Sequence, residues 1–153
     1  MTKRILVAVD GSAEATEALQ FAATEWPDAD LTALHVINPA DSTSGMDGGF
    51  PGAVDQWYDS AKGRGDRILR EAREAADREI DTRLEVGRPT ATILAVASGE
   101  AAVGDEDGAD GTGEPYDHVV LASQGRTGLS RILLGSVAEG VVRRAEVPVT
   151  VVR

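Results

Sequence analysis

The chain has 153 residues and no cysteine, which excludes disulfides, thiolate catalysis and cysteine-ligated metal clusters. Its length suits one domain over residues 1–153, able to bury roughly two thirds of its unfolded surface. Asp and Glu number 26 against 15 Lys and Arg, so the formal net charge is −11. That balance disfavours nucleic-acid binding, and no apolar run approaches the ~20 residues of a membrane span. We therefore expect a soluble, cytoplasmic protein that binds neither nucleic acid nor membrane.

The basic residues are almost all arginine, because Lys3 and Lys62 are the only lysines. An acidic, lysine-poor composition is typical of a halophilic host. At 1 M salt the Debye length falls to ~3 Å, and the self-repulsion of such a chain is screened. An ordinary acidic protein from a low-salt cytoplasm is the alternative.

The first third of the chain predicts a strand, a helix and a second strand. Residues 3–9 (KRILVAV) are an aliphatic, β-branched run after a charged start, as in a strand buried on both faces of a parallel sheet. Ser12 is suited to cap a helix that extends to about Trp26. Residues 31–36 (LTALHV) predict the second strand.

The middle of the chain contains a long stretch without periodicity. Residues 38–57 are rich in Gly, Pro, Ser and Asp, which predicts a long loop or lid and a candidate functional segment. Helical spacing of small and apolar residues then predicts a helix over 58–80, with an arginine-rich outer face that is either solvated or binds a partner. Residues 82–86 predict the third strand.

The last part repeats the alternation. Pro89 suits the first turn of a short helix. An acidic, glycine-rich insertion follows over 103–115. Its start is similar to a calcium loop but lacks the correct ligand spacing, so an acidic surface insertion is preferred over a calcium site. Residues 117–122 and 147–152 predict strands, with a helix over 136–145. The alternation predicts an open, doubly wound α/β fold with a mainly parallel, five-stranded sheet and helices on both faces.

Two segments at the carboxyl ends of predicted strands are candidates for ligand chemistry. One is Asp10-Gly11-Ser12. The other is 122–136, where glycine amides and the start of a helix at Ser136 suit phosphate groups. Walker, GxGxxG and GxSxG motifs are absent. Structural alternatives remain open: Ser136 with Glu139 is suited to a capping box, Asp10 can cap the first helix, and His35 is more simply explained as structural.

Residues 119–153 resemble the C-terminal half of the universal stress protein family, whose nucleotide-binding members carry GxxG, nine residues and then GS or GT. Gly125 and Gly135-Ser136 match this motif, whereas Ala122 stands at the position of its first glycine. The segments 5–12, 34–36 and 86–93 also match, so only 38–57 and 103–115 fall outside the resemblance. With it, we expect the strand order 3-2-1-4-5.

The resemblance implies an ATP-binding stress sensor or regulator, with or without Mg²⁺. It also implies a homodimer formed through the C-terminal strands, and an unidentified protein partner. ATP would lie between the first and fourth strands and order the flanking loops, with at most slow hydrolysis and no catalytic residue. A nucleotide-free dimeric interaction module is the alternative, and a flavin- or adenylate-using enzyme on a similar fold is a third. The implied nucleotide-binding residues are Ala8, Val9, Asp10, Val36, Ala122, Ser123, Gln124, Gly125, Arg126, Thr127, Gly128, Gly135, Ser136, Val137 and Ala138.

Overall fold

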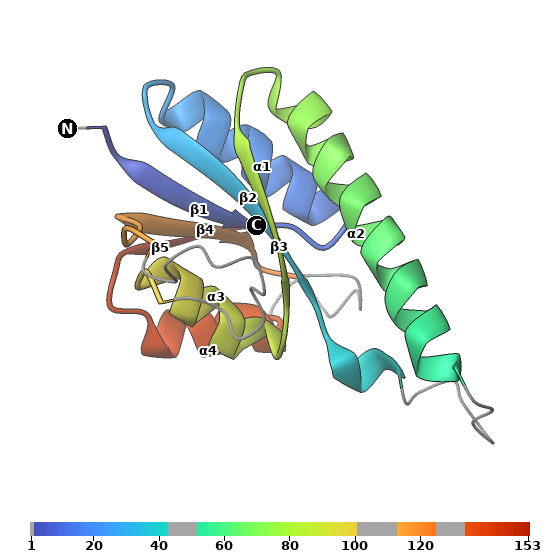
Figure 1. Cartoon of the computed structure of the whole chain (residues 1–153). Coiled ribbons are helices and arrows are strands. Elements are labelled where there is room, and N and C mark those ends of the chain that lie inside the picture. Colours follow the sequence, from blue (N-terminus) through green and yellow to red (C-terminus); the bar gives the residue numbers. More distant parts are fainter. Residues whose placement is uncertain (1, 43–51, 101–112, 125–133) are drawn as a thin grey trace.

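The computed structural model describes residues 2–42, 52–100, 113–124 and 134–153, and these form a five-stranded sheet (Figure 1). All paired strands are parallel and their order is β3-β2-β1-β4-β5, which confirms the expected topology. The strands are β1 (Arg4–Ala8), β2 (Asp30–Ile37), β3 (Asp81–Val86), β4 (His118–Ala122) and β5 (Val149–Val152).

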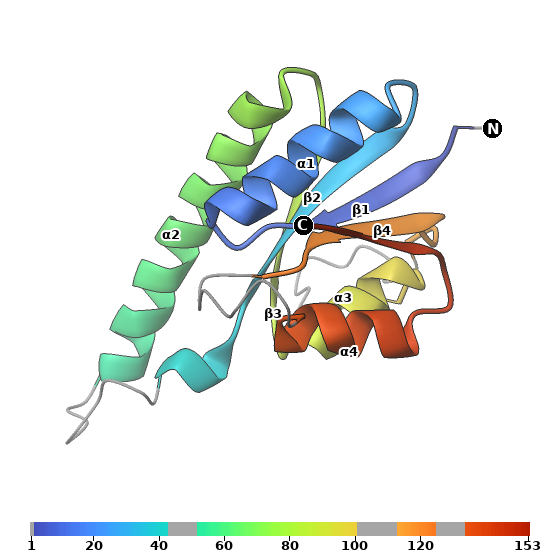
Figure 2. The same cartoon turned by 180° about the vertical axis from the view of Figure 1, so that it is seen from behind.

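Helices cover both faces of the sheet, as Figures 1 and 2 show from opposite sides. Each crossover between parallel strands carries a helix, and the direction of the crossovers across the sheet reverses after β3, so two helices pack on one face and two on the other. The first face holds α1 (Ala13–Glu25) and α2 (Ala53–Ala76), the second holds α3 (Pro89–Ala97) and α4 (Ser136–Arg144), and a short 3₁₀ helix, η1 (Pro39–Ser42), follows β2. In the part of the chain that the structure describes, no helix has the length and apolar character to cross a bilayer.

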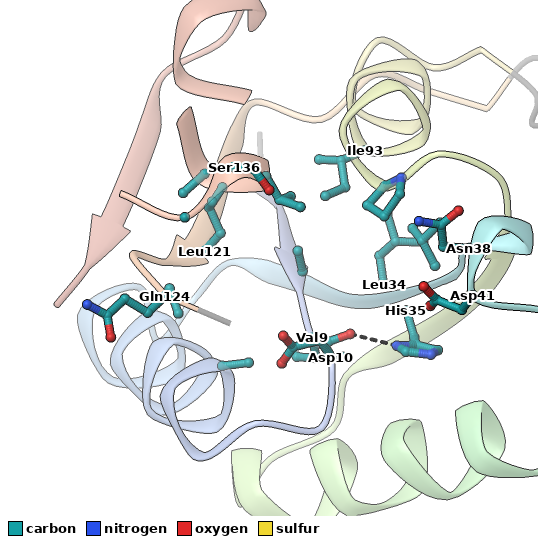
Figure 3. A pocket seen from close by; sticks show the side chains of 18 of the residues that line it. Val9, Asp10, Leu34, His35, Asn38, Asp41, Ile93, Leu121, Gln124 and Ser136 are labelled. Carbon is teal, nitrogen blue, oxygen red and sulfur yellow. Dashed lines mark hydrogen bonds between the residues drawn. The ribbon is translucent and has the colours of Figure 1, made fainter. Parts of the chain in front are cut away.

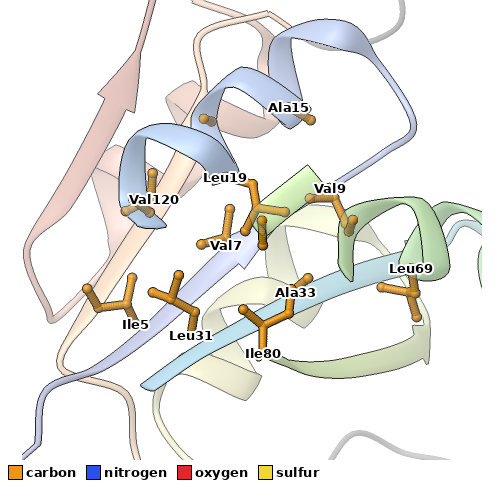
Figure 4. Packing of buried hydrophobic residues seen from close by; sticks show 14 of the residues in the cluster. Ile5, Val7, Val9, Ala15, Leu19, Leu31, Ala33, Leu69, Ile80 and Val120 are labelled. Carbon is orange, nitrogen blue, oxygen red and sulfur yellow. The ribbon is translucent and has the colours of Figure 1, made fainter. Parts of the chain in front are cut away.

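The central strand β1 supplies both hydrophobic layers. Ile5, Leu6 and Val7 are completely buried, and alternate side chains along the strand point to opposite faces. Ile5 and Val7 join the layer under α1 and α2 (Figure 4), whereas Leu6 joins the layer under α3 and α4. The unbroken aliphatic run at 3–9 is therefore explained by burial on both sides.

The start of α1 agrees with the expected cap. Ser12 is the N-cap residue, and its Oγ accepts a hydrogen bond from the amide of Ala15 (3.2 Å). At the other end, the amide of Trp26 donates to the carbonyl of Ala22 (3.0 Å). The capping role considered for Asp10 therefore belongs to Ser12. The Asp10 carboxylate instead accepts from the Ser12 amide (2.9 Å) and shapes the turn before the helix.

The prediction of one loop over 38–57 is wrong at both ends. Residues 39–42 form η1, and α2 begins at Ala53, five residues earlier than expected. The Gly- and Pro-rich composition concealed the start of a helix whose first residue, Ala53, is buried. Residues 43–51 lie outside the described part of the chain.

The helix α2 also ends earlier than the expected Ile80. Asp77, its C-cap residue, has a left-handed backbone with φ of 51°. That conformation stops the helix before Ile80, which is nevertheless buried beside it in the same hydrophobic layer. The apolar spacing that extended the predicted helix to Ile80 thus reflects burial rather than helical structure.

The capping box proposed for Ser136 and Glu139 is not formed. Gly135 is the N-cap of α4, with no capping side chain, and Ser136 is already the first helical residue. The Glu139 carboxylate instead pairs with the Arg143 guanidinium one turn later (2.8 Å). The start of α4 is therefore not closed by a side chain of its own.

The acidic insertion falls mostly on residues 101–112, which lie outside the described part of the chain, as does the calcium-loop alternative. Its flanks are close together: a Cβ added at Gly99 would lie 2.5 Å from the Gly113 carbonyl oxygen. After the insertion, the Arg4 guanidinium donates to the carbonyl of Pro115 (3.0 Å) and lies over the Tyr116 ring at 4.4 Å. These contacts attach the returning chain to β1.

Candidate functional site

A cavity of about 740 Å³ opens at the carboxyl ends of the central strands. It is lined by the ends of β1, β2 and β4, by η1 and by parts of all four helices. The sheet order changes direction between β1 and β4, and ligands of open α/β sheets bind at this kind of crevice. The position alone makes the cavity the candidate binding site.

The cavity gathers all the sequence-predicted site residues that the structure describes. They come from chain segments more than 100 residues apart, and the parallel sheet brings them to one edge. The other four, Gly125, Arg126, Thr127 and Gly128, lie outside the described residues. The eleven that line the cavity are Ala8, Val9, Asp10, Val36, Ala122, Ser123, Gln124, Gly135, Ser136, Val137 and Ala138.

The N-terminus of α4 forms one wall of the cavity. The first bond within the helix runs from the amide of Glu139 to the carbonyl of Gly135 (2.9 Å), and the amide of Gly135 itself donates to Ser123 (2.7 Å). The amides of residues 136–138 come before the first hydrogen bond within the helix, and in the described part of the chain no side chain caps them. Residues 136–138 line the cavity, so the positive end of the α4 dipole lies at the cavity wall. Such a helix end suits an anion such as phosphate.

Ala122, at the motif's first glycine position, adopts ordinary strand backbone. It is the last residue of β4 and pairs with Val152. Among the described non-glycine residues, only Asp77 has a positive φ, so the Ala122 methyl causes no backbone strain. The methyl packs against the layer under α1 and α2. Alanine therefore fits this position of the strand without strain, and Ala122 lies in the cavity wall.

Among the described residues, ten that the sequence did not predict also line the cavity. Trp57 and Arg64 are one helical heptad apart on α2, and sequence reasoning missed them because it started the helix after Trp57 and treated its arginines as solvated. An earlier helix start would have placed both on the stripe that contains Ala61. The full set is Ala15, Leu34, His35, Asn38, Asp41, Trp57, Arg64, Pro89, Ile93 and Leu121.

The two histidines occupy different environments. His35 lines the cavity, whereas His118 begins β4 at the other end of the sheet. The Nε2 atom of His118 is hydrogen-bonded to the Thr150 hydroxyl (2.7 Å), and its ring centroid lies 4.9 Å from that of Trp26. Burial, with a smaller contribution from the Lys3 cation, lowers the pKa of His118. His118 is thus part of the packing and does not belong to the cavity.

Comparison with known proteins identifies the family. The model of the universal stress protein family matches residues 1–103 and 113–153. The chain belongs to this family. The unmatched residues, 104–112, lie within the predicted acidic insertion, so the universal stress protein pattern continues on both sides of it.

Curated universal stress proteins match along nearly the whole chain. One from Methanocaldococcus jannaschii is 31% identical over 159 residues, covering 99% of this chain and 82% of the relative. A putative universal stress protein from Staphylococcus haemolyticus is 30% identical and covers 99% of this chain and 84% of its own length. The resemblance stated from the sequence is confirmed at the level of the family.

Solved structures of universal stress proteins share the fold. UspA from Lactobacillus plantarum has a TM-score of 0.74 at 23% identity, covering 99% of this chain and 97% of that protein. A universal stress protein in complex with cAMP has a TM-score of 0.58 at 24% identity, covering 99% and 96%. A family protein from Arabidopsis thaliana with AMP bound has a TM-score of 0.59 at 17% identity, covering 98% and 90%.

Proposed function

We propose that this universal stress protein binds an adenine nucleotide, ATP with or without Mg²⁺, in the cavity between β1 and β4. The observation that carries the proposal is the open N-terminus of α4 beside an apolar cavity wall. Uncapped helix amides suit phosphate oxygens, and apolar side chains suit a purine ring. Two solved family members, one with cAMP and one with AMP, support an adenine nucleotide as the ligand class.

The charges around the cavity bear on the metal. Asp10 and Asp41 both line it, and their carboxylates would repel a polyphosphate. Arg64 lines it as well and offsets part of that repulsion. We therefore expect Mg²⁺ to strengthen ATP binding, because the cation reduces the charge that the two carboxylates meet. Among the described residues, no three or more His, Cys, Asp or Glu side chains are grouped so that they could hold a metal ion by themselves.

The proposed role is regulation by population shift rather than turnover. Bound ATP would favour one arrangement of the segments 38–57 and 122–136, some of whose described residues line the cavity, and so change a surface that a protein partner recognises. Hydrolysis is expected to be slow. Steady turnover above ~1 s⁻¹, an ordinary enzymatic rate, would contradict the proposed role as a sensor or regulator.

The deciding experiment identifies the ligand that the protein carries. The protein is purified in molar KCl, the salt proposed from its acidic composition, then denatured, and the released small molecules are analysed by mass spectrometry. About one equivalent of adenine nucleotide per chain is the expected result. Calorimetry with MgATP on the emptied protein is the second arm.

An empty protein that also ignores MgATP would overturn the proposal and favour the nucleotide-free interaction module. Ala122 is the feature that favours this second candidate, since it stands in the cavity wall where the nucleotide-binding motif has its first glycine. The variant Ala122→Gly then separates the two explanations of an empty cavity. Restored binding of MgATP would attribute the loss to this one methyl, and continued absence of binding would support the interaction module.

The proposed homodimer uses the edge of the sheet. β5 is an edge strand in the described sheet, and its four residues are all partly exposed. Exposed, β-branched edges are usually paired or protected, and a second copy of β5 is the proposed partner. Size-exclusion chromatography with light scattering in molar KCl should give twice the 16.0 kDa chain mass. A monomer at micromolar concentration would contradict the dimer.

A further inference from the structure

Asn38 lies on the face of the sheet that carries the proposed site. It follows directly after β2, and the alternation of side chains along the strand places it in one row with Leu34 and Val36. Both of these residues contribute to the hydrophobic layer under α3 and α4, which also contains Ala138 at the start of α4. Asn38 lines the same cavity as all three. Its side chain therefore lies at the part of the cavity that α3 and α4 cover.

Two hydrogen bonds fix the orientation of Asn38. Its backbone carbonyl accepts from the amide of Asp41 (3.0 Å), and its Oδ1 atom accepts from the amide of Ala40 (3.1 Å), so the residue caps the start of η1. In a carboxamide only the oxygen accepts, and the bond from Ala40 therefore distinguishes Oδ1 from Nδ2. Figure 3 draws the nitrogen of Asn38 on the side of Ile93 and the oxygen on the opposite side.

The Nδ2 group has no hydrogen-bond partner among the described residues, although Asn38 is half-buried. No described side-chain nitrogen or oxygen is both inaccessible and unpaired, so Nδ2 remains accessible from the cavity that Asn38 lines. An –NH₂ group of this kind only donates. The far end of the cavity thus offers a donor of fixed direction next to an apolar wall.

We propose that Nδ2 of Asn38 donates a hydrogen bond to a ring nitrogen of the purine base. The inference rests on the proposed nucleotide function. The phosphates are assigned to the start of α4, and Figure 3 shows Asn38 across the cavity from Ser136, so the group that reaches Asn38 belongs to the nucleoside. Leu34, Val36 and Ile93 line the cavity on the same face and suit a flat apolar ring.

The direction of the bond determines what Asn38 selects. The ring nitrogens of adenine accept hydrogen bonds, whereas its exocyclic amino group only donates and is unsuited to Nδ2. A base without an acceptor at this place leaves a half-buried donor unpaired, and the protein discriminates against it. Asn38 is then a specificity-determining residue.

The test compares four ligands by calorimetry: ATP, 1-deaza-ATP, 3-deaza-ATP and 7-deaza-ATP. Each analogue replaces one acceptor nitrogen of the ring by C–H and keeps the shape of the base. The wild type is expected to bind one of the three analogues roughly tenfold more weakly than ATP through this bond. The affected analogue identifies the ring nitrogen that Asn38 contacts.

Two variants assign the preference to Nδ2. Asn38→Asp keeps an oxygen for the Ala40 amide and places a second oxygen where Nδ2 stands. That oxygen repels the lone pair of a ring nitrogen but tolerates C–H, so the affected analogue should bind at least as tightly as ATP, with the other two ratios unchanged. The added charge acts on all four ligands alike and cancels in the ratios. Asn38→Ser keeps an oxygen suited to the turn but is too short to reach the base, and its ratio should fall close to one.

The outcomes separate the inference from the function on which it rests. Absence of ATP binding to the wild type rejects the nucleotide function itself. ATP binding with the same analogue ratios in wild type and Asn38→Asp rejects only the role of Asn38, because a residue that merely shapes the turn would change all four affinities together. Where a variant does not fold, NMR of the wild type decides. ATP should shift one side-chain amide proton of Asn38 downfield, and unchanged resonances at saturation overturn the inference.

Discussion

Replacing Gly65 by alanine is expected to lower the free energy of unfolding by about 1–3 kcal/mol, the usual cost of an overpacked contact. The added Cβ would lie 2.8 Å from Cδ1 of Leu84 and 3.1 Å from Cδ2 of His35, so the Leu84 side chain must move aside or α2 must shift. Urea unfolding in molar KCl, followed by tryptophan fluorescence, measures the change.

The matched control is Gly63→Ala on the same helix. A Cβ at Gly63 meets nothing within 4 Å, so this substitution should raise stability by about 0.5–1 kcal/mol through helix propensity alone. Adding Leu84→Val to Gly65→Ala removes the nearest methyl and should recover part of the loss. Equal effects of alanine at 63 and 65 would show that α2 does not pack closely on β2 and β3.

A negative charge at the start of α4 is expected to remove most of the nucleotide affinity. In Ser136→Asp the carboxylate would lie on the cavity wall where we place the phosphates, and like-charge contacts cost several kcal/mol. We expect MgATP affinity to fall by roughly 100-fold, and partly buried pairs keep much of this effect in high salt. Isothermal titration calorimetry measures the loss.

Folding and binding respond in opposite directions to this change. An acidic side chain in the first turn interacts favourably with the helix dipole. The free energy of unfolding of Ser136→Asp should therefore be no lower than that of the wild type. The neutral control, Ser136→Asn, has almost the same shape and should retain affinity within a few-fold. Equal binding by the Asp and Asn variants would place the phosphates away from α4. Weak binding by both would indicate a steric effect instead of charge.

Much of the architecture was predictable because it depends on local pattern. The aliphatic run at residues 3–9 is a strand buried on both faces, Ser12 caps α1, and Pro89 starts α3. Each of these features depends on residues that are close together in the sequence. The same pattern placed the candidate segments at the carboxyl ends of the strands, and the family resemblance added the strand order.

The errors occurred where distant contacts outweigh local preference. Gly- and Pro-rich composition predicted a loop up to residue 57, but α2 starts at Ala53, which is buried by tertiary packing. The pair Ser136 and Glu139 has the spacing of a capping box, yet Glu139 pairs with Arg143 and Gly135 takes the cap position. Spacing along the chain shows which contacts are possible, and the surroundings decide which of them form.

The sequence by itself determined the alternation of strands and helices and the family, because hydrophobic period, caps and motif spacing are properties of neighbouring residues. Only the tertiary structure decided how the cavity is completed. Trp57 and Arg64 line the cavity because of the way α2 is rotated about its axis as it packs on the sheet. The hydrogen bond of the His35 ring goes to the carbonyl of Val9, 26 residues away. Such contacts join segments that the chain separates, so no local pattern could specify them.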